Sequence, residues 1–222
     1  MNFNFNDKED SSSAYHSSIY IDANGKLRQT FDNRYTETLN GLFIPGDRND
    51  GSASTHFSSL VKRGGKQQVI DVIKEFQDSI ETIEALPDGL YLQIRGIQEL
   101  LPISMSGDGI RRMINIISSI LDVDYHIVMI DEIDNGLHYS AHKLIWRTIL
   151  KFVQQLDIQL FVTTHNIDCL LGLKKAMEEN PDFQGLANVY NIARTKTQGF
   201  KSYRYSYNEL KEAIEQEIEI RR

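Results

Sequence analysis

The sequence has little that would favour a secreted or membrane protein. Its 222 residues include one cysteine, Cys169, which excludes an intramolecular disulfide framework and a cysteine-based zinc site. No run approaches the roughly 18 unbroken apolar residues of a membrane span. The start, Met1 to Asp7, has neither the basic nor the apolar region of a secretory signal. We therefore expect a cytoplasmic protein without membrane contact, with Cys169 as a buried structural thiol between Ile167 and Leu170.

Positive charge is also in short supply. Lys and Arg number 24 against 31 Asp and Glu, which gives a formal net charge of −7. A domain that binds nucleic acid through bulk charge is usually basic, so any nucleic-acid contact by this chain must be local. Hydrophobic residues make up 41% and charged residues 25%, which is ordinary for a globular protein. The length allows one large or compound domain with a substantial core.

The first 65 residues are weakly patterned and predict an irregular, lid-like N-terminal segment. Residues 18–31 predict a short hairpin that turns at Asn24-Gly25, because Asn-Gly supplies the positive φ of a tight turn. Residues 45–54 have the composition of a loop. We place the boundary so that residues 1–65 form this segment and residues 66–222 form the main lobe.

The main lobe alternates between helical and strand patterns. Apolar residues that step by four and three from Val69 to Ile83 predict one long amphipathic helix over 66–86. Two apolar runs, 125–130 and 158–164, lack alternation and so predict parallel strands buried on both faces. Further strands are expected over 90–95, 187–193 and 200–206, and further helices over 110–121, 140–156, 166–179 and 208–220. The predicted fold class is α/β, with a largely parallel sheet flanked by helices and right-handed crossovers.

Two acids, Asp131 and Glu132, follow the apolar strand that ends at Ile130. Ligands of open α/β sheets bind at the carboxyl ends of the strands. A carboxylate at this point suits Mg²⁺, and a second one can orient or deprotonate an attacking water. We predict Asp131 as the metal-holding residue and Glu132 as the catalytic one. The alternative is a strand that simply ends in a polar loop.

Two further motifs follow on the same side of the sheet. Asn135, Gly136 and His138 come directly after the acids, and a plain helix-entry turn is the alternative for them. His165 follows the next predicted strand, in Thr163-Thr164-His165, one crossover helix after Asp131. A histidine there can hydrogen-bond a γ-phosphate, whereas a lone histidine at a strand end is more often structural.

A Gly- and Ser-containing segment opens the predicted helix over 110–121. A helix N-terminus offers free N–H groups and a partial positive charge, and glycines let the backbone approach a phosphate. The alternative is an ordinary helix cap with a Gly-rich turn. The candidate nucleotide-binding residues of this segment are Ser104, Ser106, Gly107, Asp108 and Gly109.

In this order the motifs resemble those of ABC-type ATPases: a signature at 104–109, a Walker B pair at 131–132, a D-loop at 135–138 and a switch histidine. The D-loop has the Gly-Leu-His form of the OLD and RloA-like AAA-family ATPases. The resemblance covers residues 90–222, and its two registers leave open whether Ser104 or Ser106 is the signature serine. It implies ATP and Mg²⁺ as cofactors, ATP hydrolysis, and a homodimer in which the signature acts across the interface.

The Walker A motif of such ATPases is absent. No Gly-x-x-x-x-Gly-Lys-Ser/Thr occurs, and the nearest segment, 63–67, lacks the first glycine and the hydroxyl that binds Mg²⁺. The chain thus resembles the C-terminal half of an ATPase domain: a truncated gene, one half of a split ATPase, or a degenerate relative. We expect either a lobe that completes ATP hydrolysis with a partner P-loop lobe, or a catalytically silent interaction module. The resemblance implies a nearby-encoded effector and a role in phage defence or nucleic-acid processing.

Overall fold

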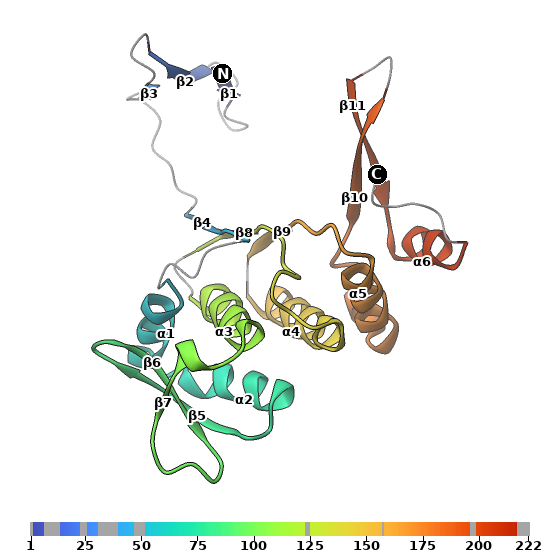
Figure 1. Cartoon of the computed structure of the whole chain (residues 1–222). Coiled ribbons are helices and arrows are strands. Elements are labelled where there is room, and N and C mark those ends of the chain that lie inside the picture. Colours follow the sequence, from blue (N-terminus) through green and yellow to red (C-terminus); the bar gives the residue numbers. More distant parts are fainter. Residues whose placement is uncertain are drawn as a thin grey trace. The chain divides into compact units, whose positions relative to one another are not determined.

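The computed structural model describes residues 2–6, 14–22, 26–30, 40–46, 52–122, 125–156, 158–195 and 199–216 (Figure 1). It divides into two compact units, Met1–Asn40 and Gly41–Arg222. Residues 41–65, which the sequence led us to group with the N-terminal segment, contribute a strand and a helix to the second unit.

The first unit is a three-stranded antiparallel sheet. Its strands β1 (Asn2–Asn6), β2 (Ala14–Ile21) and β3 (Leu27–Thr30) lie in the order β1-β2-β3. The pairing of Ile21 with Leu27 confirms the hairpin expected over 18–31, and its turn residues Asn24-Gly25 lie outside the described residues.

A parallel sheet organises the second unit. Its strands β4 (Gly41–Ile44), β8 (Ile127–Ile130) and β9 (Gln159–Val162) lie in the order β4-β8-β9, and both pairs are parallel. Strands β8 and β9 confirm the two strands expected from their apolar runs, whereas the sequence patterns missed β4. Because Ile44, Ile130 and Val162 stand in register, the three carboxyl ends meet at one rim of the sheet.

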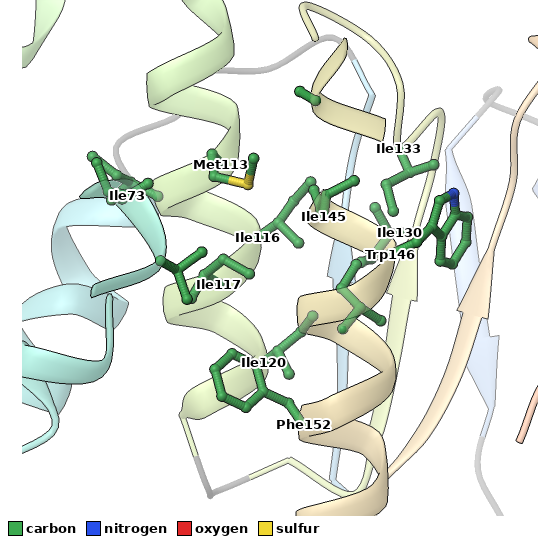
Figure 2. Packing of buried hydrophobic residues seen from close by; sticks show 14 of the residues in the cluster. Ile73, Met113, Ile116, Ile117, Ile120, Ile130, Ile133, Ile145, Trp146 and Phe152 are labelled. Atoms are coloured by element: carbon green, nitrogen blue, oxygen red, sulfur yellow. The ribbon is translucent and has the colours of Figure 1, made fainter. Parts of the chain in front are cut away.

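Helices cover one face of this sheet. They are α1 (Ser52–Lys62), α3 (Asp108–Leu121), α4 (His142–Gln155) and α5 (Ile167–Glu179) (Figure 1). The core forms where α3 and α4 pack against each other and against β8, through side chains such as Ile117, Ile145 and Ile130 (Figure 2). Helix α3 is buried along nearly its whole length because isoleucines stand on several sides of it.

The expected burial of the parallel strands on both faces is wrong for the described residues. Phe43, Met129 and Phe161 occupy one row across β4, β8 and β9, and they are 57%, 39% and 52% exposed. Val128 and Ile130 point to the opposite, helix-covered face and are fully or almost fully buried. The side chains alternate because only one face of the sheet packs against described helices.

The long helix expected over 66–86 is also wrong. Helix α2 (Lys66–Phe76) ends at Gln77, whose backbone is extended, and residues 80–86 form strand β5 (Ile80–Leu86). A β-bulge between Ile80 and Thr82 places both Ile80 and Ile83 on the buried side of the strand. Two buried isoleucines three residues apart, a spacing typical of a helix, therefore also fit this strand.

Strand β5 belongs to a second, antiparallel sheet. It pairs with β6 (Gly89–Ile94), which confirms the strand expected over 90–95, and β6 pairs with β7 (Leu101–Pro102). The chain then passes through a 3₁₀ turn, η1 (Ile103–Met105), into α3. This sheet therefore leads directly into the candidate signature segment.

The last part of the chain forms a hairpin and a helix. After two 3₁₀ turns, η2 (Tyr139–Ala141) before α4 and η3 (Pro181–Phe183) after α5, strands β10 (Val189–Thr195) and β11 (Gly199–Tyr205) pair antiparallel, as expected. Helix α6 (Tyr207–Glu215) begins with a capping box of Ser206 and Glu209. The end of the helix expected to residue 220 lies outside the described residues.

Cys169 is a buried thiol, as the sequence predicts. It lies on α5 with no exposed surface, and the indole Nε1 of Trp146 donates to its carbonyl oxygen at 3.0 Å and contacts its Sγ at 3.3 Å. Burial raises the pKa of this thiol to about 11, so the thiolate is scarce near neutral pH. Among the described helices, none is long and apolar enough to cross a membrane.

The contact between α4 and α5 gives the first prediction. A Cβ added at Gly172 would lie 2.7 Å from the Cβ of His142 and 2.8 Å from its carbonyl carbon, where backbone cannot move aside. Gly172→Ala should lower the free energy of unfolding by about 1–3 kcal/mol, measured by urea denaturation. Gly185→Ala is the control, because no atom lies within 4 Å of its added Cβ. Equal midpoints for the two variants would contradict this helix contact.

Candidate functional site

A threonine joins the ends of strands β8 and β9. The hydroxyl of Thr163 donates to the Oδ1 of Asp131 at 2.5 Å and accepts from the backbone N–H of Glu132 at 2.9 Å. The backbone N–H of Thr163 in turn donates to the carbonyl of Ile130 at 2.9 Å, and that of Ile133 donates to the carbonyl of Thr163 at 3.1 Å. The two acids that the sequence singled out are thus held by the next strand, at the rim where ligands of parallel sheets bind.

The backbone of Glu132 is unusual. Its φ of 45° makes it the one non-glycine residue with positive φ in the described part of the chain. Gly46 faces it so closely that an added Cβ would lie 3.0 Å from the Cβ of Glu132. Such conformations cost free energy and concentrate at functional sites, where the surrounding structure enforces them. The ends of β4 and β8 together fix the direction of the Glu132 side chain.

A buried arginine holds these ends together. Arg112 on α3 is 8% exposed and donates from Nη1 to the carbonyl of Pro45 at 2.7 Å. Its Nη2 donates to the carbonyls of Asp131 at 2.7 Å and Glu132 at 3.2 Å. Burial lowers the pKa of Arg112, and the charges of Asp131, Asp134 and Glu132 partly offset that shift. An arginine remains charged under such a shift, so these carbonyls receive charge-assisted hydrogen bonds.

The loop after the acids is tied to both neighbouring strands. The side-chain amide of Asn135 donates to the carbonyl of Gly46 at 2.8 Å, and the hydroxyl of Thr164 donates to Asp134 at 2.5 Å. The Asn166 side chain accepts from the backbone N–H of Asp168 at 2.8 Å and so caps α5. The candidate D-loop residue Asn135 is therefore part of the same rim as Asp131.

The candidate signature segment meets the same loop at the N-terminus of α3. A Cβ at Gly109 would lie 3.1 Å from the carbonyl oxygen of Gly136, and one at Gly136 would lie 3.3 Å from the Cβ of Asp108. Both glycines are required by this close approach, and Gly136 also has a φ of +77°. Gly107 is the N-cap and supplies no side-chain cap, and Asp108 pairs with Arg111. The first N–H groups of α3 thus lack a side-chain cap.

The two candidate signature serines differ in their surroundings. Ser106 is half-buried, and its hydroxyl donates to the carbonyl of Ile103 at 2.6 Å. Ser104 is exposed and makes no side-chain hydrogen bond with any residue that the structure describes. Ser106 directly precedes the N-cap of α3, whereas Ser104 lies inside η1.

The two candidate histidines are both exposed but differ in their bonding. The Nδ1 of His138 lies 2.9 Å from the hydroxyl of Ser140, and the ring caps η2 and stacks on Tyr139. His165 follows β9, and its ring has no hydrogen-bond partner among residues 52–122, 125–156 and 158–195. The ring of His165 therefore remains available to a ligand.

The oxygen donors at the rim fit Mg²⁺. This ion takes few protein carboxylates and keeps several waters and substrate phosphate oxygens as its other ligands. Asp131 and the hydroxyl that contacts it suit such a site, and no group of three or more His, Cys, Asp or Glu that could hold a metal occurs in the described part of the chain. Because the described residues form no all-protein cage for the ion, a Mg²⁺ site at this rim needs a phosphate ligand.

Three residues of the site were not singled out from the sequence. Thr163 and Gly46 carry only weak signals, a hydroxyl after a strand and a glycine in a loop. Arg112 carries a stronger one, because it stands between Ile110 and Met113 on a helix whose other positions are mostly apolar. A charged residue at a buried helical position indicates a specific partner.

Comparisons with known proteins identify a family and a fold. The family model described as "AAA domain, putative AbiEii toxin, Type IV TA system" matches residues 2–170. An ATP/GTP phosphatase of Helicobacter pylori (strain ATCC 700392 / 26695) is 28% identical over 111 residues, which make up 48% of this chain and 30% of that relative. The chain thus spans less than a third of this curated relative.

Solved structures show a similar fold at low identity. The match to the crystal structure of the SmcHead bound to the C-winged helix domain of ScpA covers 96% of this chain and 75% of the chain in that structure, with 10% identity and a TM-score of 0.53. The SMC head domain from Thermotoga maritima covers 92% and 72%, with 9% identity and a TM-score of 0.48. The first of these supports an α/β fold of the ATPase-head kind and nothing finer.

The contacts of Arg112 give the second prediction. Arg112→Ala leaves the carbonyls of three half-buried residues without their charged donor, and it should lower the free energy of unfolding by about 2–3 kcal/mol. Arg112→Lys should recover part of this loss, since one ammonium cannot reproduce the planar fork of donors. Urea denaturation measures both, with Arg95→Ala as the control because the ion pairs of Arg95 and its hydrogen bond to the carbonyl of Asp78 are all exposed. An Arg112→Ala midpoint equal to that of the control would contradict the assigned contacts.

Proposed function

Because this chain belongs to the AAA-domain family whose model covers residues 2–170, we propose that it forms the Walker B and signature part of an ABC-type ATP-hydrolysing head. The observation that carries the proposal is the pair Asp131-Glu132, held at the sheet rim by Thr163 and Arg112. It places one carboxylate against a hydroxyl donor and fixes the other in a strained backbone conformation.

Each residue at the rim has a separate task in this proposal. Asp131 would hold Mg²⁺, which would neutralise charge on the transferred phosphate. Glu132 orients the attacking water and accepts its proton. His165, whose ring is free at the end of β9, donates to the γ-phosphate and responds to its loss. Thr163 positions Asp131 and Glu132.

The N-terminus of α3 is the second anion site in the proposal. Its uncapped N–H groups and glycines suit a phosphate, and they act on the nucleotide held by a second copy of the chain. Met105, inside the signature segment, and Tyr139, directly after the D-loop, are 72% and 67% exposed, as expected of residues that pack against another protomer. Asn135, Gly136 and His138 would lie at this interface.

The phosphate-binding loop comes from a lobe that the printed sequence does not include. Parallel sheets normally have both faces covered and their edges protected. Here Phe43, Met129 and Phe161 form an exposed apolar row, and β9 pairs with β8 alone among the described strands. We propose that a lobe with a Gly-x-x-x-x-Gly-Lys-Ser/Thr strand covers this row, whether it belongs to the same polypeptide or to a partner.

The missing motif also defines a second candidate function. A chain with no Walker A segment of its own could act as a catalytically silent interaction module. In such a module we would expect residue 132 to have an ordinary backbone conformation, because a silent module has no need of a costly one. The positive φ of Glu132 therefore favours the first candidate. A role in phage defence with an effector encoded nearby, in the cytoplasm, stays a prediction from the family resemblance.

The third prediction concerns the chain by itself. Without a backbone nest and a lysine for the β- and γ-phosphates, the purified chain should bind ATP with Mg²⁺ weakly or not at all. Isothermal titration measures this directly. Micromolar binding by the monomer would contradict the proposal and would place the phosphate site elsewhere on the chain.

The fourth prediction concerns Glu132 once the Walker A lobe is supplied by fusion or co-expression. Glu132→Gln keeps the size of the side chain but cannot accept a proton, and phosphate release should fall by about 100- to 10,000-fold. ATP should remain bound, and the size-exclusion mass in ATP should be that of a dimer. His165→Ala should slow hydrolysis similarly and trap less dimer, since it also loses a phosphate contact.

Glu212→Gln on the exposed side of α6 is the matched control for this experiment and should hydrolyse ATP at the wild-type rate. Wild-type turnover by Glu132→Gln would refute the assignment of the base. Lost turnover without a dimer would leave Asp131-Glu132 in place and refute the cross-interface role of the signature segment.

A further inference from the structure

The hairpin of β10 and β11 differs in charge from the rest of the chain. Between Val189 and Tyr205 the sequence has four Lys or Arg residues and no Asp or Glu, in a chain whose formal net charge is −7. The same segment has four aromatic residues. The hairpin extends beyond helices α5 and α6 (Figure 1). The hairpin is therefore a local basic and aromatic surface. In a chain with a negative net charge, an anion must be bound by such a local surface.

The side chains on one face of the hairpin follow a definite pattern. Residues paired across antiparallel strands share a face. Tyr190 pairs with Arg204, and Arg194 pairs with Phe200, so an aromatic ring and a guanidinium stand together at each end of this face. Ile192 and Ser202 lie between the two pairs. We call this set of six residues the outer face.

The apolar side chains of the outer face do not belong to the core. Tyr190, Ile192 and Phe200 are 59%, 68% and 75% exposed. On the other face of β10, Asn191 is 8% exposed and Val189 is half-buried, so that face carries the packing. The structure of the chain thus gives no folding reason for three large apolar side chains on the outer face.

The cations of the outer face are only partly compensated by acids. Hydrogen bonds from Ser206 lower the pKa of the Glu209 carboxyl, and the charge of Arg204 adds to this shift. Neither Arg194 nor Arg204 forms a salt bridge with an acid in the described ranges, and the Nε of Arg204 donates to the neutral side chain of Asn188 at 2.9 Å. The two ring–guanidinium pairs stand four residues apart along each strand, a distance of about 13 Å. Each pair combines a flat aromatic surface with a guanidinium that forms no salt bridge in the described ranges.

From this arrangement we infer that the outer face binds single-stranded nucleic acid, with bases stacked on Tyr190 and Phe200 and phosphates held by Arg194 and Arg204. Single strands are bound by aromatic platforms beside basic groups, because every base offers a π-face and every linkage a negative charge. A protein surface would match the rings equally well. It would have to place an acid against each arginine, whereas a single strand supplies a phosphate at every linkage.

The test uses the full chain and a fluorescein-labelled mixed-sequence oligonucleotide, as DNA and as RNA, with binding followed by anisotropy. The single strand should bind more tightly than its duplex, since paired bases cannot stack on the rings. Raising the salt from 50 to 200 mM should weaken binding, as expected when phosphate contacts release counterions. Stronger binding of the duplex would contradict stacking.

Variants separate stacking from general stickiness. Phe200→Ala should weaken binding by about 5- to 100-fold. Phe200→Tyr should bind nearly as well as the wild type, and Phe200→Leu should bind as poorly as Phe200→Ala, because the ring rather than apolarity is needed. Arg194→Ala with Arg204→Ala removes two phosphate contacts and should reduce the slope of log affinity against log salt by roughly 1.4 units. Lys151→Ala, an exposed cation on α4, is the control and should change nothing.

Three results would overturn the inference. One is the absence of binding by any of the oligonucleotides. Another is equal loss of binding in Lys151→Ala and the double arginine variant, which would indicate diffuse charge attraction. The third is a concentration-dependent dimer that Phe200→Ala abolishes while oligonucleotide binding is unchanged, which would make the outer face a contact between copies of the chain. Circular dichroism of each variant confirms that the hairpin change leaves the fold intact.

Discussion

The guanidinium of Arg112 is the interaction on which the arrangement of the rim depends. It donates to three main-chain carbonyls that belong to the ends of two neighbouring parallel strands, and it does so while buried. Carbonyls at the ends of parallel strands have no further strand to bond, so a buried rim needs a donor from elsewhere. Because one side chain supplies it, the positions of Pro45 and Asp131 are set relative to each other and to helix α3. The same helix begins with the uncapped signature segment, so Arg112 also relates the two anion sites of the proposal.

The site is completed by contacts that tolerate no side chain. Gly46 against Glu132, and Gly109 against Gly136, bring backbone within van der Waals distance at both ends of the loop that follows β8. These contacts hold the candidate Walker B pair, the candidate D-loop and the candidate signature helix as one connected rim. The exposed row of Phe43, Met129 and Phe161 is the other side of the same sheet. A connected rim beside a sheet face that no described helix covers is the arrangement expected of a lobe that works with a second one.

The parallel sheet and the hairpin therefore each present a surface that fits a partner of different chemistry. The apolar row on the parallel sheet has no charged residue among its three members, and it matches another apolar surface. The outer face of the hairpin alternates rings with arginines and matches an anion with flat bases. The ring–guanidinium pairs arise from cross-strand register, so a shift of the hairpin by one residue would separate them. The ATPase rim and the hairpin can thus be tested separately.

The sequence by itself determined the βαβ unit, the placement of Asp131, Glu132 and His165 at one rim, and the buried thiol of Cys169. These follow from local patterns. Polar residues that directly follow an apolar strand must lie at the end of that strand, and parallel strands end at the same rim. Only the tertiary structure decided the rest. Ile80 and Ile83 have a spacing that suits a helix or a bulged strand, and pairing with β6 selects the strand. Strand β4 has the same four-residue length as β8 but lies in a weakly patterned segment, and its pairing with β8 identifies it. Arg112 shows a charge in a buried stripe, but its three acceptors come from segments up to 67 residues away. Local patterns cannot encode such contacts, because the contacts depend on which strand ends lie next to α3 in the folded chain.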